Sequence, residues 1–125
     1  MPSLRLPLAI LIIALLTGCG SSRPSAESVA PTVRAASTAA DQADQSGASQ
    51  HAALELRTAR QKVQQAQAAL DSGDTERALR LAEQAEVDAA LAEATARAAT
   101  AQAAVEEVRE TIRVLREEIQ RNRTR

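Results

Sequence analysis

The sequence predicts an all-α protein, either an alanine-rich antiparallel helical hairpin or a three-helix coiled coil, with one long C-terminal helix. Alanine, the strongest helix former, is the commonest of the 125 residues. The chain contains no Phe, Trp or Tyr, the side chains that bury the largest areas in a thick globular core. Alanine and aliphatic residues recur at alternating spacings of four and three, which is the pattern of a coiled coil. We therefore expect thin, elongated helices.

Residues 1–18 have the layout of an export signal, with the positive Arg5 followed by an apolar stretch over residues 6–16. Spanning a bilayer takes about 20 apolar residues, so this stretch is too short for a permanent transmembrane helix. We expect residues 1–18 to be removed as a signal peptide.

The only cysteine of the chain, Cys19, follows this segment directly. The residues before it have the pattern of a bacterial lipoprotein cleavage motif: Leu16, Thr17 and Gly18. A lone cysteine in an exported protein is normally paired, lipidated or a liability, and the chain has no second cysteine for pairing. We therefore predict that Cys19 carries acyl chains such as palmitate, each buried methylene contributing roughly 0.8 kcal/mol to anchoring. The alternative is a free or buried thiol.

The residues after the cysteine bear on the location of the protein. Gly20 and Ser21 stand where an aspartate favours inner-membrane retention of enterobacterial-type lipoproteins. By this resemblance the expected location is the cell envelope, at the outer membrane and facing the periplasm, in an organism with two membranes.

Residues 19–30 are expected to form a flexible tether, because serine and proline are frequent there and apolar residues are few. Residues 31–125 are expected to form the helical coiled-coil domain. Its first helix is expected over about 31–45, since Pro31 suits the first turn of a helix and small residues follow at spacings of three and four.

The second helix is expected over about 50–71, where apolar residues alternate at four and three. They are Ala52, Leu56, Ala59, Val63, Ala66 and Leu70. A turn then ends this helix. Gly73 suits the left-handed position after a helix, and Asp74 suits the N-cap of the next one.

The third helix is expected over about 75–121, roughly 70 Å at 1.5 Å per residue. An alanine stripe from Ala78 to Ala103 should face the second helix. A bulkier stripe lies beyond the reach of that helix: Val105, Val108, Ile112, Leu115 and Ile119. This second stripe needs a partner, which is the first helix folded back, another copy of the chain, or another protein.

The charged residues and the single histidine give no sign of catalysis. The formal net charge is −1, and neither a basic surplus nor an aromatic residue is present for nucleic-acid binding. His51 alone cannot build a histidine-based metal cluster or a catalytic relay. We therefore expect a protein that is not an enzyme, with no cofactor, metal or small-molecule substrate. The basic C-terminal tail has two readings, contact with envelope anions or favourable interaction with the helix dipole.

Three segments carry a resemblance to known sequences. Residues 56–63 read Leu-Arg-Thr-Ala-Arg-Gln-Lys-Val, residues 69–74 read Ala-Leu-Asp-Ser-Gly-Asp, and residues 81–89 read Leu-Ala-Glu-Gln-Ala-Glu-Val-Asp-Ala. Over about residues 52–119 the chain resembles a bacterial family, domain of unknown function 4398. The resemblance implies a small exported protein, often a lipoprotein, with alanine-rich helices and no established reaction.

The expected function is that of a lipid-anchored, non-enzymatic lipoprotein of the cell envelope, acting as a structural or adaptor helical protein in the periplasm. Its expected partners are the membrane, through the acyl chains, and either a second copy or an envelope protein. The alternative is a tetratricopeptide-like peptide- or protein-binding module, because residues 69–79 resemble the middle of such a repeat. One unit alone forms no groove, since repeat folds need about three to stack.

Overall fold

The computed structural model describes residues 23–125 of the chain, and these residues are almost entirely helical. The helices are α2 (Ala26–Gln45), α3 (Ala48–His51), α4 (Ala53–Asp71) and α5 (Thr75–Arg123). The prediction of an all-α fold with one long C-terminal helix is confirmed. The expected signal peptide, its cleavage motif and Cys19 lie outside the described residues.

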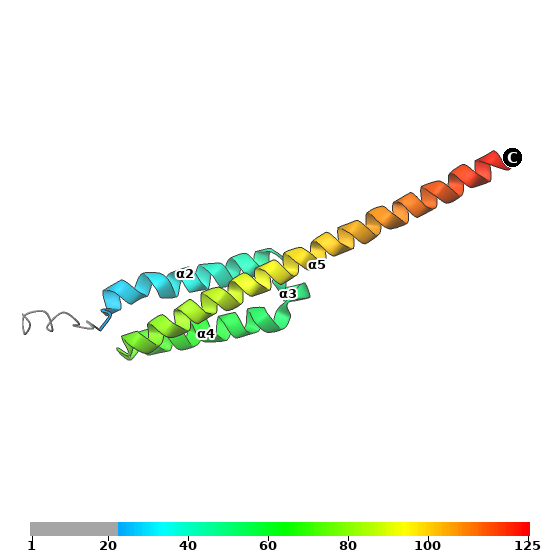
Figure 1. The fold of residues 1–125 in the computed structure, drawn as a ribbon. Helices are drawn as coiled ribbons and strands as arrows, with labels where there is room; N and C mark the ends of the chain where they lie inside the picture. The colour runs from blue at the N-terminus through cyan, green and yellow to red at the C-terminus, as the bar shows by residue number, and fades with distance from the viewer. Residues whose placement is uncertain (1–22) are drawn as a thin grey trace, which may run out of the picture.

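Helices α2, α4 and the first half of α5 form an up-down-up bundle, and the second half of α5 extends from it alone (Figure 1). One end of the bundle joins Val29 of α2, Ala69 of α4 and Ala78 of α5 in a single cluster. The other end joins Ala43 of α2 and Leu56 of α4 to Ala96 of α5. Helix α4 therefore runs antiparallel to both of its neighbours, and the start of α2 lies far from the C-terminus.

The core of the bundle is built of alanine. Among the described residues, 17 apolar residues are buried and 14 of them are alanine. Alanine buries little area, so each contact contributes little hydrophobic stabilisation, but it allows helices to pack closely. The larger buried side chains are Val29, Val33 and Leu56. The expected thin helical assembly is what the structure contains.

Helix α2 begins at Ala26, so the predicted helix start at residue 31 is wrong, and residues 26–30 belong to the helix instead of the expected tether. Ser25 has an extended backbone and its hydroxyl oxygen accepts a hydrogen bond of 3.2 Å from the Ser28 amide, which is N-cap geometry. Pro31 is inside the helix on the exposed side. The helix continues through it because Val29 and Val33 are both buried in the bundle, and this burial offsets the hydrogen bond that proline removes.

The second helix also differs from the expectation, which placed its start near residue 50. The single turn α3 comes first, and the chain breaks at Ala52 (φ −145°, ψ 42°) before α4 begins. Gly47, at a φ of 88°, turns the chain out of α2. The break keeps both Ala48 and Ala52 buried beside Leu56, so core packing explains an interruption that alanine itself does not signal.

The turn between α4 and α5 agrees with the prediction. Gly73 has a φ of 80°, and its amide donates to the Leu70 carbonyl at 3.0 Å. The Asp74 amide donates to the Ala69 carbonyl at 2.9 Å, which completes a Schellman motif. The Asp74 carboxylate then accepts a hydrogen bond of 3.2 Å from the Arg77 amide and caps α5.

Candidate functional site

The candidate functional site is the distal arm, defined as residues 101–125, in which every residue is exposed. The arm continues α5 beyond the bundle without Gly or Pro, the usual causes of a kink. Helix α2 does not reach it, because the last buried alanine of α2, Ala43, packs against Ala92 and Ala96. Of the three partners expected for the bulkier stripe, the folded-back first helix is therefore excluded.

The distal stripe lies along this arm and is built of large aliphatic side chains. Its residues are Val105, Val108, Ile112, Leu115 and Ile119, each between 42% and 57% exposed. Their alternating spacing of three and four places them on one face of the helix. A continuous apolar stripe without cover is typical of an interaction surface.

The alanine stripe on the bundle half of α5 behaves differently. Its buried members are Ala78, Ala82, Ala85, Ala89, Ala92 and Ala96. They face α4 as expected, and they face α2 as well. Two further members of the predicted stripe lie where the bundle ends: Ala99 is half-buried and Ala103 is exposed.

Ion pairs within the arm support an isolated helix. Arg109 contacts Glu106 at 2.6 Å, Arg113 contacts Glu117 at 3.0 Å, and Arg113 also pairs with Glu110. The hydrogen bond from the Arg113 guanidinium lowers the pKa of Glu110, and the same contact raises the pKa of Arg113. Such exposed pairs contribute little to stability one by one, because water screens them, but several together favour a helix that packs against nothing.

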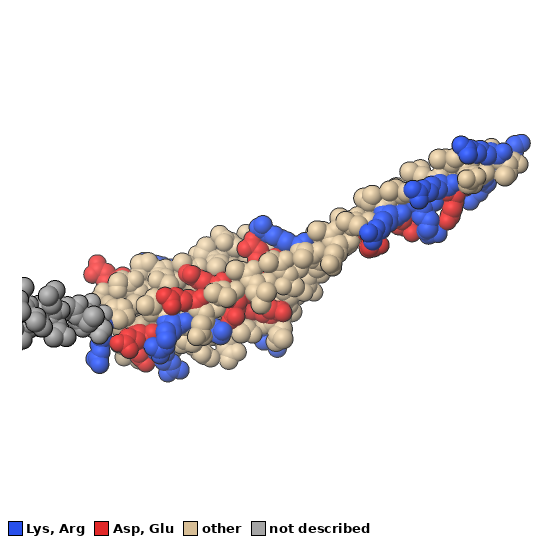
Figure 2. All heavy atoms as spheres, viewed as in Figure 1, with Lys and Arg blue, Asp and Glu red and all other residues tan. Residues whose placement is uncertain are grey.

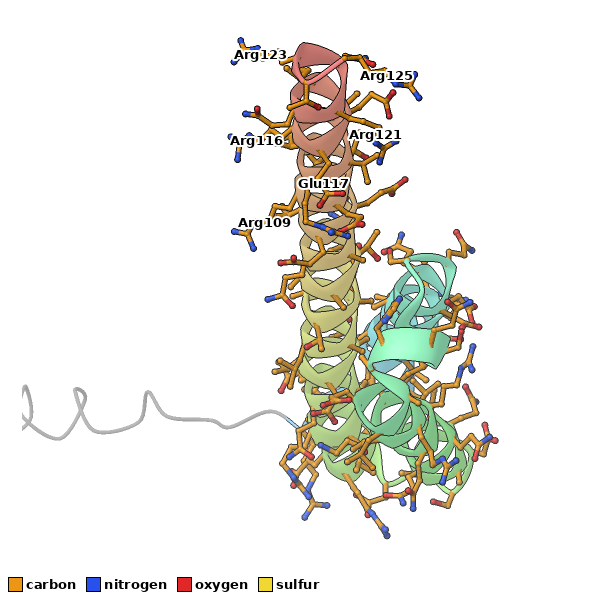
Figure 3. All side chains as sticks on the ribbon, turned by 90° about the vertical axis from the view of Figure 1, so that its right-hand side faces the viewer. Arg109, Arg116, Glu117, Arg121, Arg123 and Arg125 are labelled. Atoms are coloured by element: carbon orange, nitrogen blue, oxygen red, sulfur yellow. The ribbon has the colours of Figure 1, made fainter. Side chains whose placement is uncertain are left out.

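An arginine row runs along one edge of the distal stripe. Arg109, Arg116 and Arg123 are seven residues apart and point to the same side of the helix, as Figure 3 shows. Arg121 and Arg125 point to the other side (Figure 3). The neck at residues 98–105 contains no charged residue, and it is the tan segment between bundle and arm in Figure 2. We expected the stripe from the sequence but missed the arginine row, which becomes visible only when the stripe is used as a heptad reference.

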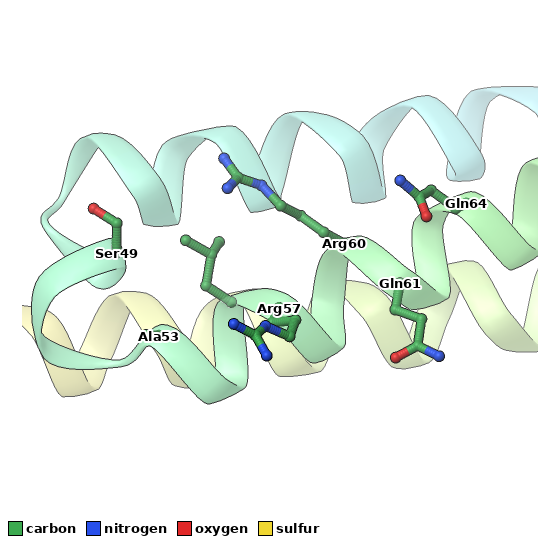
Figure 4. Close-up of a pocket in the computed structure, with 7 residues that line it drawn as sticks. Ser49, Ala53, Arg57, Arg60, Gln61 and Gln64 are labelled. Atoms are coloured by element: carbon green, nitrogen blue, oxygen red, sulfur yellow. The ribbon is translucent and has the colours of Figure 1, made fainter.

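A surface groove of about 460 Å³ lies along α4 in the bundle (Figure 4). Its lining residues are Ser49, Ala53, Leu56, Arg57, Arg60, Gln61 and Gln64. Arg60 is held by α2, because its Nη2 atom donates to Asp44 Oδ2 at 2.7 Å. This hydrogen bond, followed by one from Ser49, lowers the pKa of Asp44. The groove thus contains one end of an ion pair between α2 and α4. Its lining residues include no nucleophile placed beside a base.

A second ion pair joins α4 to α5. Lys62 Nζ lies 2.6 Å from Asp88 Oδ2, and both side chains are about a quarter exposed. That oxygen accepts no well-aligned hydrogen bond, so the pair acts through charge. His51 is exposed at the end of α3.

Within residues 23–125, no three side chains of metal-binding type lie close enough together to hold an ion. Over the same residues, no helix combines the length and apolarity that crossing a bilayer requires.

The fold and the distal arm define a class of protein, an alanine-core three-helix bundle whose last helix extends as an uncovered arm. The chain belongs to the family described as domain of unknown function (DUF4398), whose sequence model matches residues 31–108. This match covers most of the bundle and the start of the distal stripe, whereas Ile112, Leu115 and Ile119 lie beyond it. No curated protein and no solved structure gives a significant match to the chain.

Proposed function

We propose that this protein is a lipid-anchored, non-enzymatic lipoprotein of the bacterial cell envelope, and that it acts as a structural or adaptor element through its distal arm. The observation that carries the proposal is the arm itself, in which five large aliphatic residues form one stripe that no other described helix covers. A helix of this kind presents a surface for another protein, and nothing in its side chains supplies a reaction.

The predicted anchor gives the arm a direction. Helix α2 begins at Ala26, and at roughly 3.5 Å per extended residue the connection from Cys19 spans at most about 25 Å. The start of α2 lies at the opposite end of the molecule from the C-terminus (Figure 1). In the proposed arrangement the bundle stays near the membrane, at the periplasmic face of the outer membrane, and the arm points away from it.

The alternative function, a tetratricopeptide-like binding module, needs an open concave face between stacked hairpins. In the described residues the inner face of the α4–α5 hairpin is filled by alanine and covered by α2. We therefore favour the adaptor function.

The anchor is tested by metabolic labelling with a palmitate analogue. The unchanged protein should incorporate the label and sediment with membranes, whereas Cys19→Ser should do neither. Ser21→Ala, a substitution two residues away that leaves the thiol, serves as the matched control and should behave like the unchanged protein. An unlabelled parent protein would remove the lipid anchor from the proposal.

The adaptor role is tested by a photo-crosslinking amino acid placed in the arm in intact cells. At Leu115, on the stripe, we expect covalent capture of a protein partner. At Glu117, which lies on the other side of the same helical turn, we expect none. If neither position captures a protein, the arm is not an interaction surface.

A further inference from the structure

We infer that the distal stripe is covered by a second copy of this chain, so that two distal arms form a parallel two-stranded coiled coil. The inference specifies the partner of the proposed adaptor arm and rests on that function for the biological role of the arm. It does not depend on the lipid anchor.

The residues of the stripe select the number of strands. Val105, Ile112 and Ile119 occupy heptad positions a, and Val108 and Leu115 occupy positions d. β-branched residues at a combined with leucine at d favour two parallel strands over three or four. The only leucine of the stripe lies at d and both isoleucines lie at a, so the arm has the two-stranded pattern.

The charged edges of the stripe select the orientation. Positions e hold the arginine row, and the last of these residues is Arg123. In a parallel pair, a residue at position g faces position e of the next heptad on the other helix, so Glu118 faces Arg123 of the partner copy, and the reverse contact forms by symmetry. In an antiparallel pair the same edges of the two helices meet, and the arginine row lies beside another arginine row. Charge therefore opposes the antiparallel pair and supports the parallel one.

The side chains that make these contacts are available. Arg123 forms no ion pair with another described residue. Glu118 contacts Arg121 at 3.4 Å, and this exposed contact is weak enough to exchange for another arginine.

The bundle leaves room for the second copy. The buried alanine stripe and the distal stripe are about 150° apart around α5 when counted at 3.5 residues per turn. The heptad pattern continues towards the bundle through Leu91, Ala94, Ala98 and Ala101, all of which are exposed. A partner helix can therefore lie on the side of α5 away from α2 and α4. Pairing ends near Leu91, because Glu83 and Asp88 would face each other as like charges below it.

The pairing is tested with single cysteines in the full chain carrying Cys19→Ser, so that the introduced residue is the only thiol. Val108→Cys and Leu115→Cys should each form a disulfide-linked homodimer on mild oxidation. Glu117→Cys, on the opposite side of the helix, should form no disulfide-linked dimer. Circular dichroism before oxidation should show equal helix content in all three variants, so that a difference in crosslinking reports position and not folding.

Orientation has its own readout. If the pair is parallel and in register, mixing Val108→Cys at position d with Ile119→Cys at position a should give the two homodimers and few mixed dimers, because positions a and d meet only in an antiparallel pair. A predominance of mixed dimers would show an antiparallel pair and overturn the inference. A chain that sediments as a monomer at micromolar concentration would overturn it as well, while palmitate labelling of Cys19 would be unaffected.

A charge exchange tests the edge contacts. Glu118→Arg should weaken dimerisation by about tenfold, because two attractive contacts become repulsive. The double variant Glu118→Arg, Arg123→Glu should restore the dissociation constant of the unchanged protein. If the single variant dimerises as tightly as the parent, Glu118 and Arg123 do not meet across the pair.

Discussion

The two halves of α5 carry the same spacing of apolar residues but differ in the size of those residues. In the bundle half, alanines meet α2 and α4, which belong to the same chain and are brought close by short turns. In the distal arm, valine, isoleucine and leucine stand where no described part of the chain reaches. Association of separate molecules costs translational and rotational freedom, by about 4–15 kcal/mol, whereas helices joined by a turn avoid that cost. Larger side chains in the arm are therefore what an intermolecular contact requires.

The largest expected effect is a loss of association that leaves the stability of the bundle unchanged. Replacing Val108, Ile112 and Leu115 together by Asp should weaken association by more than about 3 kcal/mol, roughly 100-fold, because three apolar side chains per copy are lost. Analytical ultracentrifugation measures the association. The urea midpoint of the bundle should change little, since none of the three residues contacts it. A bundle that unfolds in this variant would show that the halves are not independent.

A smaller effect is expected for overpacking of the alanine stripe. Ala82 is fully buried, so Ala82→Leu should lower the free energy of unfolding by about 1–3 kcal/mol. Ala103→Leu, on the same stripe but exposed in the arm, should change it by less than about 0.5 kcal/mol. Urea denaturation followed by circular dichroism compares the two variants. Equal losses would mean that the stripe packs against something along its whole length.

The turn that returns the chain from α4 to α5 should be less sensitive. Gly73 has a φ of 80° and nothing lies within 4 Å of the position of an added Cβ, so the cost of a side chain is conformational alone. Gly73→Ala should destabilise the bundle by about 1 kcal/mol. Asn tolerates the left-handed region better, so Gly73→Asn should lose less. A larger loss of stability for Asn than for Ala would contradict this, because it would mean that the added side chain meets a steric contact at the turn.

The smallest expected effect concerns pH, and it differs between the halves. The hydrogen bond from Arg113 places the pKa of Glu110 below its ordinary value of 4.5, so the contribution of the pair is present above that pH. It is lost as the pH falls through the lowered pKa. Far-UV circular dichroism should therefore show the arm losing a little helix in acid. Glu110→Gln should lack this transition, and an unchanged acid profile would mean that the pair does not support the helix.

The same linkage should act on tertiary structure in the bundle. The hydrogen bond from the Arg60 guanidinium lowers the pKa of Asp44 from its ordinary value of 3.8, so the contribution of this ion pair is present above that pH and is also lost in acid. Because Asp44 belongs to α2 and Arg60 to α4, loss of their ion pair should slightly weaken the packing between two helices, whereas loss of the Glu110 pair affects one helix only.

Much of the bundle could be predicted from the sequence, because its helices and the α4–α5 turn depend on residues that are close together in the chain. The four-and-three spacing specified α4 and α5, and Gly73 with Asp74 marked the turn between them, since each of these residue types is selected by backbone geometry. The start of α2 was not accessible in this way. The preference of proline for a first helical turn pointed to Pro31, while burial of Val29 and Val33, a tertiary effect, extended the helix back to Ala26.

Excluding the first helix as the cover of the distal stripe also required the three-dimensional structure. The sequence allowed the first helix to cover the stripe, and only the packing of Ala43 against Ala92 and Ala96 shows where α2 ends relative to α5. The anchor at Cys19 and the envelope location stay predictions from the signal pattern, because these residues lie outside the described part of the chain.

The continuity of α5 has a mechanical consequence. Bundle and arm share one helix of 49 residues with no Gly or Pro, so the two halves move as a stiff lever. The arm projects by about 35 Å, at 1.5 Å per residue. A tilt of the bundle by about 10° would therefore sweep the tip through about 6 Å, somewhat more than one helical turn. A small change in the orientation of the bundle would therefore displace the tip of the arm far enough to change its contacts with a neighbouring molecule.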